Sequence, residues 1–298
     1  ETKERKVIHD RHLSPMIISL EIILSLHADA YKRGFMHDKF IGNTLISVYA
    51  KCGSMPQAMN AYCCISNPDI VSWTALLSAF FEQHQPEKSL QLYIQLPQEE
   101  LIRNHQTFLI ALQACGSLAE AEEAIMVDGQ LCKPLALSIG RGVHADTLAL
   151  GVQSSQFVAN TLISMYGKCG SIFDATKVFS GLSDFDVVTW NAMLSAYVER
   201  GDVKKALLLY RQMEEENVNP NRQTFMTVVQ ACGDFVNVDQ EDYSTKAVCL
   251  EIGQALHSGA RKKSLASDVF VGTTLIKMAS VGMYVKPRMC SMDYVNTI

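Results

Sequence analysis

Short polar residues recur along the chain at a spacing of four, where their side chains could hydrogen-bond a ligand. Residues four apart lie above one another on one side of a helix, so each such line forms a polar stripe. A short amide or hydroxyl can hydrogen-bond the edge of a nucleobase, so one such position per structural unit would contact one base. The stripes are Asn43, Ser47 and Lys51; Thr74, Ser78 and Glu82; Asn160, Ser164 and Lys168; and Asn191, Ser195 and Glu199.

The segments that carry these stripes repeat along the chain. Asn43–Ser54 recurs with small changes as Asn160–Ser171, and Val71–Ala75 recurs at the same offset of 117 residues as Val188–Ala192. A fainter third copy starts at Thr273. Similarity at several separate places in one register is typical of a repeat array. Further matches at this offset are Gln106–Phe108 with Gln223–Phe225 and Gln113–Cys115 with Gln230–Cys232.

Helical periodicity divides the chain into units. Apolar residues recur at i, i+3, i+4 and i+7 in each candidate helix, as Leu45, Val48, Tyr49 and Cys52 illustrate, which predicts an all-α stack of helical hairpins. We expect these units: 1–38, a partial long repeat; 39–69, short; 70–104, standard; 105–155, long with an insert; 156–186, short; 187–221, standard; 222–268, long with an insert; and 269–298, a degenerate partial repeat and tail.

The long units carry acidic inserts, Ser117–Lys133 and Asp234–Lys246, which we expect to be poorly packed surface loops remote from the polar stripes. After Met278 the pattern ends and the second helix of the last hairpin is missing. An array that ends there exposes an apolar face unless something caps it. We therefore expect the chain to be a piece of a longer array.

Bulk composition restricts the classes of partner. The 298 residues are 48% apolar and 19% charged, which allows each unit to bury one face. The net charge of −5 does not favour a nonspecific polyanion binder. The longest apolar run, Met16–Leu26, is too short and too interrupted to cross a bilayer, so no membrane partner is expected.

Neither a metal site nor a catalytic site is expected. The nine cysteines include no Cys-x-x-Cys, and the repeat-equivalent pairs Cys52/Cys169 and Cys115/Cys232 fall on apolar faces, which favours reduced structural thiols. Single histidines in successive units lack a second ligand at metal spacing, and no His-x-Glu is present for a zinc deaminase. We therefore predict no catalytic residue, metal or cofactor.

One standard unit resembles a pentatricopeptide repeat. The resemblance lies in Val187–Leu194, then Gly201, Ala206-Leu207, Tyr210, Met213 and Asn219-Pro220-Asn221. The cycle of long, short and standard units resembles the PLS-type subgroup of land-plant organelles, here without the C-terminal editing (DYW) extension. The resemblance covers residues 39–278 and implies a right-handed superhelical α-α solenoid.

The resemblance also implies roles for particular residues. In pentatricopeptide repeats the fifth and last residues of a unit read one base, which gives the pairs Asn43/Asp69, Thr74/Asn104, Asn160/Asp186 and Asn191/Asn221. Second residues wedge against the base, which gives Phe40, Val71, Phe157 and Val188. Lys51 and Lys168 match a position that approaches phosphate, whereas Leu109 and Met226 fill the fifth position of the long units and cannot read by hydrogen bonds.

By the family's pairing tendencies, these pairs would select the sequence U-A-x-U-C-x. The implied function is sequence-selective binding of single-stranded RNA in organellar RNA processing, stability or editing, in a mitochondrion or chloroplast, alongside other RNA-processing proteins. The alternative is a solenoid that binds a peptide in the same groove, which the negative charge favours.

Overall fold

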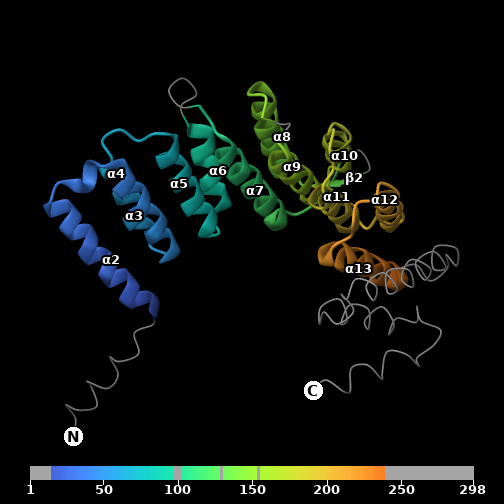
Figure 1. The fold of residues 1–298 in the computed structure, drawn as a ribbon, viewed down its shortest axis with the longest axis horizontal. Coiled ribbons are helices and arrows are strands. Elements are labelled where there is room, and N and C mark those ends of the chain that lie inside the picture. The colour runs from blue at the N-terminus through green and yellow to red at the C-terminus, as the bar shows by residue number, and fades with distance from the viewer. Residues whose placement is uncertain (1–14, 97–101, 128–129, 153–154, 239–298) are drawn as a thin grey trace, which may run out of the picture. The chain divides into compact units, whose positions relative to one another are not determined.

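The computed structural model describes residues 15–96, 102–127, 130–152 and 155–238, which fold almost entirely into α-helices (Figure 1). They form two compact units: the described residues up to Glu122 together with 139–152, and residues 123–138 together with those from 155 onward. The two helices of each predicted short or standard unit pack together as a hairpin, and the predicted all-α solenoid architecture is confirmed. The third copy at Thr273, the tail, and the second insert beyond residue 238 lie outside the described residues.

In the first unit, each hairpin is followed by a helix that packs on its first helix. Thus α3 contacts α4 and α5, and α5 contacts α6 and α7. The elements are α2 (Pro15–Lys32), the short 3-10 helix η2 (Phe35–His37), α3 (Lys39–Lys51), α4 (Met55–Cys64), α5 (Ile70–Glu82), α6 (Pro86–Gln95), α7 (His105–Ala121) and the greater part of α8 (Pro134–Ala149).

The second unit has the same arrangement. Helix α9 packs on α10 and α11, and α11 packs on α12 and α13. Its elements are the strands β1 (Ile125–Val127) and β2 (Gln130–Cys132), followed by α9 (Gln156–Lys168), α10 (Ile172–Ser180), α11 (Val187–Glu199), α12 (Val203–Glu215) and α13 (Arg222–Val238). Helices begin at residues 39, 70, 105, 156, 187 and 222, where the predicted units begin; the grouping into repeats stays a prediction.

Short acidic and amide side chains start the first helices. Asp38, Asp69, Asn104 and Asp186 each accept backbone N–H groups from the first turn of the following helix, which satisfies donors that the helix itself leaves unpaired. All four capping residues are also the last residues of predicted units, and three of them, Asp69, Asn104 and Asp186, belong to predicted reading pairs. The position that would read a base is therefore held in place by the next helix.

The first helices bury more than the single face that the periodicity predicts. In α3, Leu45 and Tyr49 are buried as expected, but Ile46 and Ala50 are buried as well, whereas Val48 is only half-buried. The reason is that α3 is covered twice, once by its hairpin partner α4 and once by the next first helix, α5. A stacked first helix thus needs a wider apolar surface than an isolated amphipathic helix.

The expectation of a poorly packed loop at Ser117–Lys133 is wrong. Helix α7 continues to Ala121 because Leu118 and Ala119 extend its apolar face and are buried. The segment then forms an antiparallel hairpin in which β1 pairs with β2. This hairpin docks on the turn between α9 and α10, where Lys133 N donates to Cys169 O at 3.1 Å.

Among the helices of the described ranges, none has the length and apolar character that crossing a bilayer requires. The same residues bring together no group of three or more His, Cys, Asp or Glu side chains able to hold a metal ion. Cys115 and Cys169 are buried, as their apolar positions predict, and Cys52 is half-buried.

Candidate nucleic-acid interface

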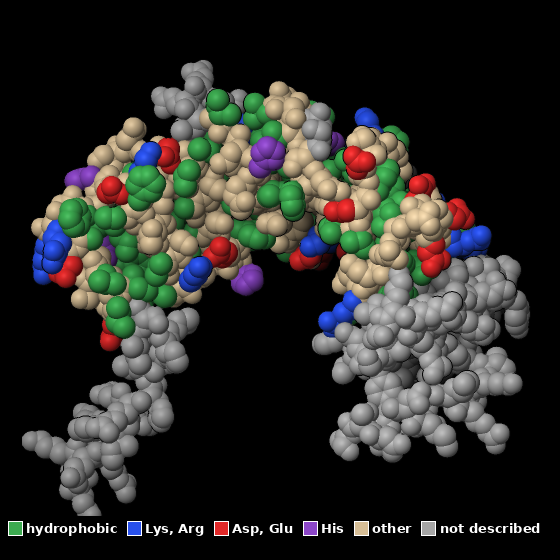
Figure 2. All heavy atoms as spheres, viewed as in Figure 1, with side chains coloured by type: hydrophobic (Ala, Val, Ile, Leu, Met, Phe, Trp, Pro, Cys, Tyr) green, Lys and Arg blue, Asp and Glu red, His purple; other side chains and the backbone are tan. Residues whose placement is uncertain are grey.

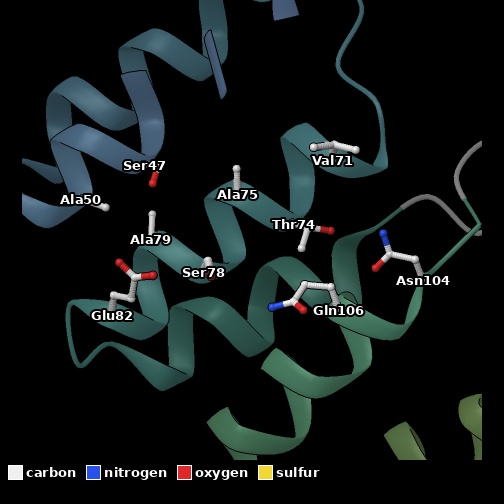
Figure 3. A pocket seen from close by; sticks show the side chains of 10 residues that line it. All are labelled: Ser47, Ala50, Val71, Thr74, Ala75, Ser78, Ala79, Glu82, Asn104 and Gln106. Atoms are coloured by element: carbon white, nitrogen blue, oxygen red, sulfur yellow. The ribbon is translucent and has the colours of Figure 1, made fainter. Parts of the chain in front are cut away.

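A cleft of about 310 Å³ lies across the row of first helices in the first unit. Figure 3 shows how α5 supplies its floor, with Ser47 of α3 on one side and Asn104 and Gln106 of α7 on the other. The polar stripe residues Thr74, Ser78 and Glu82 all line it. The cleft therefore brings together the fifth and last residues of the first standard unit and the stripe beside them.

The pair Thr74 and Asn104 is joined through a buried hydroxyl. Thr74 Oγ1 donates to Ile70 O at 2.6 Å and lies 3.1 Å from Thr107 Oγ1. Asn104 Oδ1 accepts from Thr107 N and from Thr107 Oγ1, both at 2.9 Å. Because Asn104 Oδ1 accepts from the first turn of α7, the group of Asn104 that remains available to a ligand is its amino group. Thr74 Oγ1 still has a lone pair that can accept a hydrogen bond. The pair can thus offer one donor and one acceptor.

The pair Asn191 and Asn221 makes direct contact in the second unit. Asn191 Nδ2 donates to Asn221 Oδ1 at 3.1 Å, and Thr224 Oγ1 donates to Asn191 Oδ1 at 2.7 Å. Asn221 Oδ1 also accepts from Thr224 N at 3.0 Å. Both amide oxygens are therefore occupied, so the groups that remain on the pair are N–H donors.

Burial of the fifth residues is deeper than a solvated stripe requires. Thr74 and Asn191 are each only 8% exposed. Both side chains take part in the hydrogen bonds described above, and only a small part of each is accessible to solvent. A ligand that contacts them must therefore insert between neighbouring first helices.

In the short units the last residue is an aspartate. Asp69 Oδ1 caps α5, and its Oδ2 accepts from Lys39 Nζ at 2.7 Å; this hydrogen bond is the main cause that lowers the pKa of Asp69. Asp186 Oδ1 accepts from Thr189 N and Oγ1 at 2.7 and 2.9 Å. The fifth residues Asn43 and Asn160 each have a buried Oδ1 that no described residue contacts as a donor.

The second residues of the predicted units are exposed although they are apolar. Phe40 and Phe157 are 74% and 77% exposed, and Val71 and Val188 are 55% and 52% exposed. Val71 lies on the wall of the cleft beside Thr74 (Figure 3). Exposed aromatic side chains beside hydrogen-bonding pairs form a surface on which a flat apolar group can stack.

Charge is spread over the surface. On the face in Figure 2, the Lys and Arg side chains of the described residues lie interspersed with Asp and Glu. Lys51 ends α3 and is exposed, and its equivalent Lys168 ends α9 and is half-buried. Leu109 and Met226, at the fifth position of the long units, are half-buried.

Sequence reasoning missed two kinds of residue. Hydroxyl residues at the third position, among them Thr107 and Thr224, hold the capping side chains; their signal was the repeated Gln-Thr-Phe at 106–108 and 223–225. Lys39, at the first position of a short unit, gave no signal, because its repeat equivalent is Gln156.

Comparisons with known proteins agree with this arrangement. Residues 186–234 match the PPR repeat family, and residues 43–67, 71–101 and 157–187 match the PPR repeat. The Arabidopsis thaliana pentatricopeptide repeat-containing protein At4g18520, chloroplastic, is 30% identical over 85% of this chain and 36% of the relative. The mitochondrial At3g53360 of the same plant is 30% identical over 70% of this chain and 25% of the relative.

A solved structure shares the fold. The pentatricopeptide repeat protein PPR10, crystallised in complex with an 18-nt psaJ RNA element, superposes with a TM-score of 0.53 at 19% identity, over 83% of this chain and 39% of that one. The chain thus spans about a third of the length of the relatives that it matches. On the family matches, the relatives and the shared fold, the chain belongs to the pentatricopeptide repeat family.

Proposed function

We propose that this part of the protein binds single-stranded RNA sequence-selectively, with one base at each short or standard unit. The observation that carries the proposal is the recurrence of one arrangement in both compact units: an exposed apolar second residue beside a polar pair formed by the fifth and last residues. The RNA bound in the PPR10 structure supports it, because PPR10 has the same fold.

The hydrogen-bonding groups of each pair support the order U-A-x-U-C-x. Thr74 and Asn104 offer an acceptor and a donor, which complement the amino group and N1 of adenine. Asn191 and Asn221 offer only donors, which complement N3 and O2 of cytosine and oppose the N3–H of uracil. An aspartate carboxylate, as in Asp186, accepts that N3–H instead and so favours uracil.

Affinity in this proposal comes from stacking and base contacts more than from charge. The net charge of −5 gives little general attraction to phosphate. Local attraction would come from cations at the ends of first helices, such as Lys51 of α3 and Lys168 of α9. Stacking on aromatic side chains contributes about 1–3 kcal/mol per base. Phe40 and Phe157 are therefore the residues that we expect to contribute most to affinity.

The proposed role is non-catalytic and organellar. The chain would act as the recognition part of a PLS-type protein in RNA processing, stability or editing, with other RNA-processing proteins as partners. Relatives with chloroplastic and mitochondrial names support an organellar location.

A binding titration tests this function. Fluorescently labelled RNA with the core U-A-x-U-C-x, its complement, and DNA of the same sequence would be titrated with the 298-residue chain at one fixed salt concentration. We expect preference for the first RNA over both competitors. The double variant Phe40→Ala, Phe157→Ala should lose affinity while keeping its thermal unfolding midpoint, because both side chains are exposed.

Two results would count against the proposal. One is equal binding of all three nucleic acids, and the other is an unchanged affinity in the double variant. If the wild type bound none of the three, the peptide-binding alternative would gain.

A further inference from the structure

A buried hydroxyl occupies the third position of four of the first helices, α5, α7, α11 and α13. Ser72, Thr107, Thr189 and Thr224 are all fully buried. The hydroxyl oxygens lie 3.4, 2.9, 2.9 and 3.1 Å respectively from an oxygen of the capping side chain three residues earlier. That capping side chain is, in every case, the last residue of the preceding unit. The hydroxyl therefore touches half of each pair that the proposed function assigns to one base.

Behind the two standard units the hydroxyl reaches the other half of the pair as well. Thr107 Oγ1 lies 3.1 Å from Thr74 Oγ1, and Thr224 Oγ1 lies 2.7 Å from Asn191 Oδ1. No such second contact joins Ser72 to Asn43 or Thr189 to Asn160; those two asparagines keep an Oδ1 without a described partner. Of these four described hydroxyl residues, Thr107 and Thr224 therefore connect the fifth and last residues of a unit.

We propose that Thr107 and Thr224 are positioning residues that determine base choice in the unit before them. The inference rests on the proposed function, since it concerns the same pairs. Neither threonine needs to touch the base. Each would act by fixing which atoms of the reading pair face the ligand.

The chemistry of the amide explains why such a residue is needed. A carboxylate has two equivalent oxygens, so rotation about its last bond leaves the presented acceptor unchanged. A carboxamide has one acceptor and one donor, and rotation by half a turn exchanges them. Thr224 removes this ambiguity for Asn191, because its hydroxyl hydrogen needs an acceptor and so holds Oδ1 inward.

The hydrogen count at Thr224 is consistent with this role. Its hydroxyl accepts from Asn221 N at 3.1 Å and has one hydrogen to donate. Asn221 Oδ1 already accepts hydrogen bonds from Thr224 N and Asn191 Nδ2. The hydroxyl hydrogen of Thr224 is therefore donated to Asn191 Oδ1, which is the nearer oxygen. Without this hydroxyl, Asn191 Oδ1 would be a buried acceptor with no donor, and its amide would gain by turning outward.

The test compares Thr224→Val, which keeps the shape but removes the hydroxyl, with Thr224→Ser, which restores it. Binding of the 298-residue chain is measured to four RNAs of the core U-A-x-U-N-x that differ only at the fifth base. The wild type should prefer C. Thr224→Val should reduce that preference by about fivefold or more, the equivalent of one unpaired buried polar group, and Thr224→Ser should recover it.

Thr189→Val is the matched contrast, because its hydroxyl contacts the carboxylate Asp186 and not an amide. Its preference for U at the fourth base should persist even where affinity falls for all RNAs alike. Thr107→Val provides a second site, read at the second base, in case Thr224→Val does not fold. A merely structural role would weaken binding to every RNA equally and leave the base ratios unchanged, which would overturn the proposal.

A measurement without RNA separates this inference from the proposed function. Side-chain amide NMR signals of Asn191 and Asn221 should shift or broaden in Thr224→Val and return in Thr224→Ser. Unchanged signals in a folded Thr224→Val would overturn the positioning role. Failure of the wild type to bind RNA, with the NMR result as expected, would instead count against RNA reading alone.

Discussion

The short and standard units occur twice, as residues 39–104 in the first compact unit and 156–221 in the second. Both copies have first helices of the same length, α3 with α9 and α5 with α11. Both expose a phenylalanine and a valine at the second positions. What the copies share is thus the stacking surface and the exposed apolar positions beside it.

The copies differ at the fifth residue of the standard unit and in the surroundings of the turn that follows the first helix of the short unit. The first has Thr74 at the fifth position of its standard unit, and the second has Asn191. The turn at Gly53 is open apart from Gln83, whereas the turn at Gly170 is covered by the β-hairpin. Helix packing therefore keeps the helices of the two copies alike, whereas the reading pairs and the turns differ between them.

The largest expected difference between the copies is at these turns. Both glycines have positive φ, 71° for Gly53 and 81° for Gly170, so an alanine at either position should cost about 1–2 kcal/mol. At Gly170 the added Cβ would also overlap the carbonyl oxygen of Leu131. Overpacking adds about 1–3 kcal/mol, so Gly170→Ala should cost about 2–5 kcal/mol.

The two tryptophans allow the copies to be followed separately. Trp73 lies in the first unit against Tyr62, and Trp190 is buried in the second against Phe179 and Phe185. Urea unfolding would be followed by fluorescence, with Trp73→Phe or Trp190→Phe leaving one reporter. Equal losses in Gly53→Ala and Gly170→Ala would mean that the hairpin does not restrain the second turn.

The next largest effect should appear when the reading pairs are exchanged. Asn104 and Asn221 are the same residue type, so the reading pairs of the two standard units differ only in the fifth residue, Thr74 or Asn191. Asn191→Thr should move the fifth base from C toward A, and Thr74→Asn should move the second from A toward C. A mismatched group left unpaired costs about 1–3 kcal/mol, and titration of matched RNAs at fixed salt measures it.

The exchange has a built-in control. Each variant should change one base preference and leave the other three positions as they are in wild type. If both variants rank the RNAs as wild type does, the fifth residues do not select bases, even if the chain binds RNA.

The helices were predictable from the sequence because their burial follows from local spacing. Leu45 and Tyr49 lie on one helix face because they are four residues apart. The caps at Asp69 and Asn104 likewise involve only residues within the first turn of the next helix. The hairpin at 125–132 was not predictable, because its docking depends on Cys169 and Gly170, far away in the sequence.

The candidate site was predictable only in part. The positions of the pairs followed from the repeat register, but their hydrogen bonds did not. The contacts of Asn191 with Asn221 and with Thr224 cross about one unit of sequence and need two helices to be stacked. Register can place a residue in a repeat, but only packing decides which of its atoms remain available.

The smallest expected effect concerns Lys39, which pairs with Asp69 in the first copy, while Gln156 holds the equivalent position in the second. Lys39→Gln would make the first copy resemble the second. The ion pair is largely exposed, so its loss should lower stability by at most about 1 kcal/mol at neutral pH. Gln156→Lys, the reverse change, should add no more than this.

The pH dependence of that loss identifies its source. Lys39 lowers the pKa of Asp69, so the ion pair stabilises the folded state above the ordinary pKa of the carboxyl group, and this contribution disappears as pH falls through the lowered pKa. Wild type and Lys39→Gln, compared by Trp73 fluorescence in urea, should therefore differ at about pH 7 and converge as the pH falls through the lowered pKa of Asp69. Lys39 also occupies the oxygen that would accept from uracil. Hence Lys39→Gln should raise selectivity for U at the first base toward that at the fourth, and an unchanged selectivity would mean that the lysine leaves Asp69 when RNA binds.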